Sequence, residues 1–162
     1  MSTTRGKLPL VGVMCTTRVS INLMCSFELR GKNALRVLIA DDHVAVRKGV
    51  CAILSSRLDI EVCGEAANGK EAIEKAMELK PDLIILDVTM PVMNGLDAAR
   101  EIVKILPNTP VLMLSMHENK QIIAEAKSIG AKGYVTKMQA SEALLRAVDA
   151  LMTDQIFYPL LA

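Results

Sequence analysis

The sequence predicts an α/β domain with a five-stranded parallel sheet and helices on both of its faces, in a doubly wound arrangement. From residue 35 onward, short apolar runs alternate with amphipathic helical patterns, which is the order that successive βα units produce. The run over residues 83–86 is apolar without alternation, as expected for a central strand buried on both faces. With 162 residues, the chain can form one domain with a sizeable core but not two full ones.

The strands and helices are predicted in chain order from the spacing of apolar residues. Strands are expected over residues 35–40, 60–66, 82–86, 110–114 and 131–136. Between and after them, apolar residues recur at helical spacing, and each set forms one stripe that can pack on the sheet. These sets are Val46, Val50, Ile53 and Leu54; Ile73, Ala76 and Met77; Leu96, Ala99, Val103 and Leu106; Ile122, Ile123, Ala126 and Ile129; and Leu144, Leu145, Val148 and Leu151. Pro81 and Pro107 are expected to end two helices, and Ser141 to cap the last one.

The composition predicts a globular, cytoplasmic protein. Hydrophobic residues make up 51% of the chain and charged residues 23%, and the formal net charge is +1. Neither this charge nor the two tyrosines and two phenylalanines indicate a nucleic-acid surface. The four cysteines show no paired metal-ligand spacing and no CxxC motif, which favours reduced thiols. No stretch approaches the roughly 20 apolar residues that a membrane helix needs, so no membrane partner is expected.

Residues 1–34 are predicted to form a poorly ordered extension, because chain termini are disordered unless they are tied down. Arg5 and Lys7 precede a short apolar run over residues 8–15, which faintly suggests a signal peptide, although Arg18 weakens that interpretation. The alternating pattern over residues 19–29 could instead add an edge strand.

Polar side chains follow four of the five predicted strands at the point where each strand ends. Asp41 and Asp42 follow the first strand, Asp87 the third, Ser115 the fourth and Lys137 the fifth. In open parallel sheets, ligands bind outside the carboxyl ends of the strands, where the strand order reverses. The second strand has no such group at its end, which fits an edge strand farther from the site.

Three carboxylates that converge at this edge require a cation. Like charges about 4 Å apart repel by roughly 4 kcal/mol at an effective dielectric constant near 20. Ligation by oxygen atoms and several waters suits Mg²⁺ (or Mn²⁺) better than zinc. A carboxylate can act as a nucleophile and form an acyl phosphate, and Asp87 is the best placed to do so. Lys137 and Ser115 could bind phosphoryl oxygens, and the chain has no GxSxG, HExxH or P-loop motif that would indicate fast turnover.

The segments IADDH, LDVTMPVMNG, LMLSMHEN and GYVTK resemble the response-regulator receiver family of two-component systems (the CheY-like superfamily), in the family's order and spacing. The resemblance covers residues 35–152, and the DDH and LSMHE segments are most similar to the NarL/FixJ branch. It implies a flavodoxin-like (βα)5 fold with the strand order 2-1-3-4-5.

The resemblance also implies roles for individual residues. Asp87 matches the phosphoacceptor, Asp42 a direct metal ligand and Asp41 the second member of the acidic pair. Thr89 would lend its backbone carbonyl to the metal, so that the implied metal site comprises Asp41, Asp42, Asp87 and Thr89.

The implied switch consists of Ser115, which matches the family's switch hydroxyl, and Tyr134, which matches an aromatic whose rotamer follows phosphorylation. From the strand pattern alone, Tyr134 is expected on a half-exposed face. Lys137 matches the family's lysine, but Met138 stands where many receivers have proline, which leaves the local peptide geometry open. His43 and His117 border the site and are expected to be solvated loop residues.

The implied function is the receipt of a phosphoryl group from a sensor histidine kinase, with self-phosphorylation and slow autodephosphorylation but no other enzymatic activity. The face formed by the fourth helix, the fifth strand and the fifth helix would then switch, and a homodimer could form on phosphorylation. Residues 153–162 are interpreted as a tail or the start of a linker to a DNA-binding output domain that this chain does not contain. A truncated regulator of transcription and a stand-alone single-domain regulator both remain open.

A phosphatase or phosphotransferase of the haloacid-dehalogenase type is an alternative from another class, because its nucleophilic Asp also ends a parallel strand. An Asp or Thr two residues further on assists in that family, and Thr89 fits. The pair Asp41 and Asp42 favours the receiver, since the other family takes its later acidic ligands from the carboxyl-terminal side of the chain. A degenerate receiver that acts only as a binding module would lack a site residue, and none is missing.

Overall fold

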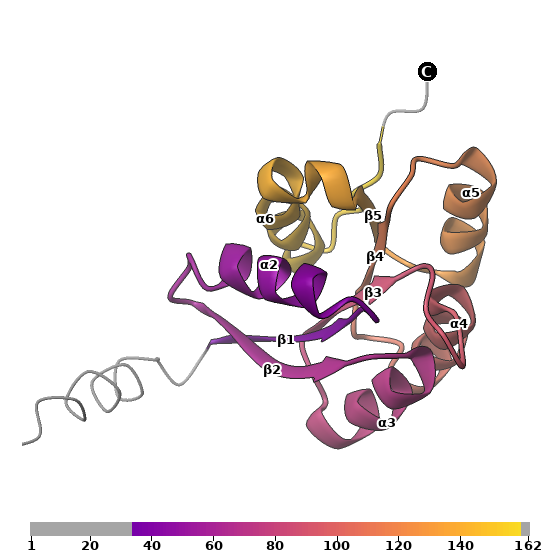
Figure 1. Cartoon of the computed structure of the whole chain (residues 1–162), viewed down its shortest axis with the longest axis horizontal. Coiled ribbons are helices and arrows are strands. Elements are labelled where there is room, and N and C mark those ends of the chain that lie inside the picture. Colours follow the sequence, from indigo (N-terminus) through magenta and orange to yellow (C-terminus); the bar gives the residue numbers. More distant parts are fainter. Residues whose placement is uncertain (1–33, 160–162) are drawn as a thin grey trace, which may run out of the picture. The chain divides into compact units, whose positions relative to one another are not determined.

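The computed structural model describes residues 34–159, which form a five-stranded, wholly parallel sheet with helices on both faces (Figure 1). The strands are β1 (Leu35–Ala40), β2 (Ile60–Ala66), β3 (Leu83–Asp87), β4 (Val111–Ser115) and β5 (Gly133–Thr136). Their order in the sheet is β2-β1-β3-β4-β5. The predicted fold, strand order and edge position of the second strand are therefore confirmed, and the predicted strand ends differ by at most two residues. The predictions for residues 1–33 lie outside the described residues.

The helices divide between the two faces of the sheet. They are α2 (Val44–Leu54), α3 (Gly69–Leu79), α4 (Gly95–Ile105), α5 (Lys120–Ile129) and α6 (Ala140–Met152), and a short 3-10 turn, η1 (Lys137–Gln139), precedes α6. Helices α2 and α6 cover one face, and α3, α4 and α5 cover the other (Figure 1). Alternate residues of each central strand point to opposite faces, so Val37 and Ile39 pack with α2 and α6 while Leu38 packs with α3. Strand β3 is buried along its whole length, as predicted.

Asparagine side chains begin three of the helices. Asn68, Asn94 and Asn119 each accept a hydrogen bond from a backbone N–H in the first turn of α3, α4 and α5, respectively. The predicted cap of the last helix is wrong, because α6 begins at Ala140 and Ser141 lies inside it. Pro81 and Pro107 follow the ends of α3 and α4, as expected.

Met77 does not pack on the sheet as predicted and is 54% exposed. The inward stripe of α3 is built on Ala72 and Ala76, which are four residues apart and therefore on one face of the helix. Met77 is one residue further on, which turns its side chain away from that face. Among the described helices, none combines the length and the apolar character that crossing a bilayer requires.

The residues after α6 pair with the free edge of β5. The N–H of Phe157 donates to the carbonyl of Lys132 at 2.9 Å, and the carbonyl of Phe157 accepts from the N–H of Tyr134 at 2.7 Å. This pairing is parallel, and the hydroxyl of Tyr158 also donates to the carbonyl of Ala131 at 2.6 Å. The described part of the predicted tail thus covers the β5 edge.

Candidate functional site

Three of the predicted site residues meet at the carboxyl edge of the sheet. The Nζ atom of Lys137, which follows β5, lies 2.7 Å from Oδ2 of Asp41 and 2.9 Å from Oδ1 of Asp87. The side chains of these residues are 9%, 0% and 2% exposed, respectively. A parallel sheet brings these strand ends together although the residues are far apart in sequence.

Asp42 lies beside them at the surface, with 29% of its side chain exposed. Its Oδ1 is 2.8 Å from Nδ1 of His43, and the backbone N–H of His43 donates to Oδ1 of Asp41 at 2.9 Å. One ligand atom from each of Asp41, Asp42 and His43 lies within 4.8 Å of the others. His43 is exposed, as is His117, so both are the solvated loop residues expected, but the sequence did not predict the contact between His43 and Asp42.

The loop after β3 is held close to Asp87. A Cβ atom on Gly95 would lie 1.9 Å from the carbonyl oxygen of Asp87, so only glycine allows α4 to begin here. Within the loop, the N–H of Met93 donates to the carbonyl of Pro91 at 2.7 Å across Val92, whose φ is 67°. This is a γ-turn in a conformation that β-branched residues rarely adopt. Thr89 is exposed in the same loop, two residues beyond Asp87.

Ser115 and Tyr134 share one acceptor. The hydroxyl of Ser115 donates to the carbonyl of His117 at 3.1 Å, and the hydroxyl of Tyr134 donates to the same carbonyl at 2.8 Å. Tyr134 is 1% exposed, so the expectation of a half-exposed face is wrong. The strand pattern could not show that the chain beyond α6 would cover the edge of β5. Burial raises the pKa of Tyr134 above its ordinary value.

The charges at this edge do not balance. Burial raises the pKa of Asp87, and the charges of Asp41 and Asp42 add to this, while Lys137 opposes it. Burial alone would lower the pKa of Lys137, but its bonds to Asp41 and Asp87 outweigh burial and raise it, so the ammonium group stays charged. One ammonium group faces three carboxylates, which leaves negative charge for a further cation to neutralise.

The donor atoms at this edge fit a small divalent cation. Oδ2 of Asp41 is buried, and its contact among the described residues is the ion pair with the ammonium group of Lys137, which that group shares with Asp87. One ammonium group shared between two buried carboxylates leaves negative charge on this oxygen. Together with the carboxylates of Asp42 and Asp87, it gives the all-oxygen donor set that Mg²⁺ prefers.

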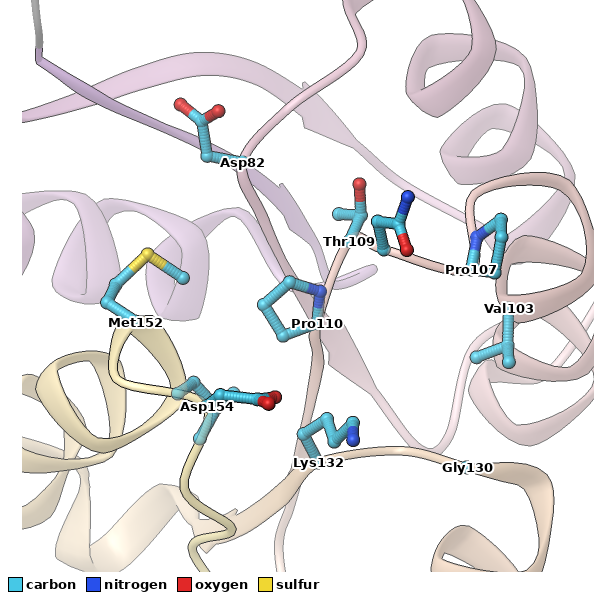
Figure 2. A pocket seen from close by; sticks show the side chains of 11 residues that line it. Asp82, Val103, Pro107, Thr109, Pro110, Gly130, Lys132, Met152 and Asp154 are labelled. Carbon is cyan, nitrogen blue, oxygen red and sulfur yellow. The ribbon is translucent and has the colours of Figure 1, made fainter.

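A cavity among the described residues lies elsewhere. It has a volume of about 470 Å³ and is bordered by Asp82, Thr109, Pro110, Lys132 and Asp154, among others (Figure 2). Three of these residues directly precede strands, so the cavity opens at the amino edge of the sheet, opposite the carboxylates. Convergent charged groups, and not cavity size, identify the candidate site.

Comparison with known proteins identifies the family. The family model described as the response regulator receiver domain matches residues 37–149. The chain is 40% identical over 125 residues to the transcriptional regulatory protein LnrK of Bacillus subtilis, a match that covers 77% of this chain and 57% of LnrK. It is 44% identical over 114 residues to the response regulator protein VraR of Staphylococcus aureus, covering 70% of this chain and 54% of VraR. The chain thus spans a little over half the length of these curated relatives.

Solved structures agree with this assignment. A LuxR-family two-component response regulator from Aurantimonas sp. SI85-9A1 superposes with a TM-score of 0.74 at 31% identity, over 76% of this chain and 89% of that one. The receiver domain of the regulator NarL from Mycobacterium tuberculosis gives 0.65 at 32% identity, over 72% and 98%. The CheX-CheY-BeF3-Mg+2 complex from Borrelia burgdorferi gives 0.69 at 29% identity, over 73% and 89%.

These matches favour the receiver over the haloacid-dehalogenase alternative, and they agree with the predicted likeness to the NarL/FixJ branch. The chain belongs to the response-regulator receiver family of two-component systems.

Proposed function

We propose that this receiver accepts a phosphoryl group on Asp87 from a sensor histidine kinase, with Mg²⁺ or Mn²⁺ held by Asp41, Asp42, Asp87 and the backbone carbonyl of Thr89. The observation that carries the proposal is the contact of one buried ammonium group, that of Lys137, with two carboxylates from different strands. A buried lysine between carboxylates is a cation held ready for an anionic ligand. When bound, the metal would neutralise phosphoryl oxygens and lower the repulsion between those oxygens and the carboxylates.

The chain's own groups divide the chemistry between them. Lys137 engages Oδ1 of Asp87, so we expect the other carboxylate oxygen to attack phosphorus. As that O–P bond forms, the bond between phosphorus and the kinase histidine breaks, and the histidine leaves with the electron pair. Lys137 then binds a phosphoryl oxygen in place of Oδ1 while it keeps its contact with Asp41.

Ser115 is proposed to transmit the change. Its hydroxyl has one proton, which it donates to the carbonyl of His117 in this structure. If it donates to a phosphoryl oxygen instead, Tyr134 remains as a donor to that carbonyl. The competition for one proton would shift the loop between β4 and α5, and with it the face formed by α5, β5 and α6.

The kinase is proposed to dock on exposed apolar residues around the site. They follow the carboxyl ends of four different strands and are Val44, Val92, Met116 and Met138. Such a rim can exclude water from the acidic centre when a partner covers it. Met138, which replaces the more common proline, is 83% exposed. The peptide geometry that this replacement left open is trans, as are all peptide bonds of residues 34–159.

The output is proposed to be the regulation of transcription in the cytoplasm, through a DNA-binding domain that lies outside this chain. Two features support this: relatives are named as transcriptional regulators, and the chain spans little more than half of their length. We also propose that a homodimer forms on phosphorylation. The alternative output is stand-alone action as a single-domain regulator.

The test is intact-mass spectrometry after incubation with acetyl phosphate, with and without Mg²⁺. The wild-type chain should gain a single Mg²⁺-dependent phosphoryl adduct, and Asp87→Ala should gain none. Asp82→Asn is the control, because Asp82 is an exposed aspartate at the opposite edge of the sheet and should leave the adduct unchanged. An adduct that persists in Asp87→Ala would show that the phosphoacceptor is another residue.

A further inference from the structure

Arg47 lies on α2 behind the acidic pair and binds its main chain. Its Nη1 donates to the backbone carbonyl of Asp41 at 2.7 Å, and its Nε donates to Oε2 of Glu65 at 2.8 Å. The Arg47 side chain is only 14% exposed, and its bond to Asp41 is partly buried, whereas the Glu65 side chain is 47% exposed. The planar guanidinium fork thus joins the carboxyl end of β1 to β2.

The position of this bond matters because the sheet ends here. The N–H of Asp41 donates to the carbonyl of Ala66 at 3.1 Å, and β1 has its last residue at Ala40. Beyond Asp41 the strand ladder no longer fixes the main chain. The bond from Arg47 to the carbonyl of Asp41 fixes the peptide that joins Asp41 to Asp42, and both carboxylates extend from that peptide.

We propose that Arg47 is a positioning residue for the divalent cation: it sets the peptide between Asp41 and Asp42 so that both carboxylates face Asp87. This inference rests on the proposed metal site. Repulsion between converging carboxylates pushes them apart when no cation is bound. A backbone anchor resists that movement and so keeps the donor atoms at the spacing that binding requires, which is how groups outside the ligand set usually tune a metal site.

Arg36 offers a matched control within the same chain. Its guanidinium also donates to a main-chain carbonyl, that of Leu79 at 2.6 Å, but it does so at the start of β1 and the end of α3. Arg36→Ala therefore removes a bond of the same kind without touching the carboxylates. If the role of Arg47 were purely structural, Arg47→Ala and Arg36→Ala should have the same effect on metal affinity.

The experiment is a Mn²⁺ titration of the full chain followed by electron paramagnetic resonance, with thermal unfolding recorded for each metal-free variant. Arg47→Ala should raise the Mn²⁺ dissociation constant by about tenfold, which is the lower end of the effect of groups that orient metal ligands. Arg36→Ala should leave the constant unchanged. Arg47→Lys, which keeps the charge but loses the planar fork, should give a smaller loss of Mn²⁺ affinity. If Arg47→Ala does not fold, Arg47→Lys tests whether Arg47 positions the metal ligands.

Two results would overturn the inference: a folded Arg47 variant with wild-type affinity, or an equal loss of affinity in Arg36→Ala. The failure of the metal site itself is distinguishable, because then the wild-type chain would not bind Mn²⁺, or Asp42→Asn would bind it as tightly as wild type.

Discussion

At the scale of single residues, Gly95 determines how closely α4 approaches the end of β3 at Asp87. Because an added Cβ would lie 1.9 Å from the carbonyl oxygen of Asp87, Gly95→Ala must move the main chain of Asp87 or the start of α4. We expect it to destabilise the fold by about 2 kcal/mol, as overpacking does, and to reduce the yield of the phosphoryl adduct. Gly49→Ala is the control, since its Cβ would meet nothing within 4 Å in the middle of α2; it should stabilise by about 0.5–1 kcal/mol. Urea denaturation measures both, and equal effects would contradict the argument.

Val92 is the second residue whose backbone is constrained near the site. A φ of 67° in a γ-turn is strained for a β-branched residue, and a sparsely populated backbone conformation costs roughly 1–3 kcal/mol. Val92→Gly removes this cost but makes the unfolded chain more flexible, so we expect a net gain in stability of about 0.5–1 kcal/mol. Val44→Gly should instead destabilise, because Val44 is an exposed valine without a positive φ. A loss of stability in Val92→Gly would show that the γ-turn is not strained.

At the scale of elements, hydrophobic spacing predicted the sheet well because strands that are buried on both faces contain little else than apolar residues. The ends of β3, β4 and β5, by contrast, were misplaced by one or two residues, since pairing with neighbours sets them. Asp41, Asp87 and Lys137 could be grouped as a site because the carboxyl ends of parallel strands converge. The sequence could not show Arg47 reaching a backbone carbonyl or Phe157 pairing with β5, because both contacts depend on how elements pack.

The pairing of Phe157 with β5 and the bond from Tyr158 to Ala131 make a prediction for alkaline pH. Burial raises the pKa of Tyr158 to about 12 and also raises that of Tyr134, and these are the two tyrosines of the chain. An unfolded tyrosine ionises near its ordinary pKa of about 10. Between these values the unfolded state holds fewer protons than the folded state, so stability falls as pH rises.

Ultraviolet titration should therefore show little tyrosinate in the folded chain at a pH where free tyrosine is half ionised. The free energy of unfolding should fall by up to about 3 kcal/mol through Tyr158 as pH rises from about 10 to 12. Tyr158→Phe should reduce this fall and leave a single phenol to titrate. Ionisation of both phenols near the ordinary pKa would contradict the docking of the tail.

At the scale of the whole molecule, the proposed metal site would link metal binding to folding. The site brings three carboxylates together, of which Asp41 and Asp87 are buried, and this opposes folding when no cation is present. A cation that binds the folded state alone stabilises it by mass action, by about 2.7 kcal/mol at a concentration one hundred times the dissociation constant. Saturating Mg²⁺ should therefore raise the melting temperature of the wild-type chain.

Asp42→Asn should separate the two effects. The substitution removes one of the converging charges, so we expect the metal-free variant to be at least as stable as the metal-free wild type, with most of the Mg²⁺ stabilisation lost. Thermal unfolding with and without Mg²⁺ compares the four states, and NaCl at matched ionic strength controls for general screening of charge. If NaCl stabilises the wild type as much as Mg²⁺ does, the edge attracts cations without forming a metal site. If Asp42→Asn keeps the full response, Asp42 is not a ligand, and the donors must come from Asp41, Asp87 and the loop after β3.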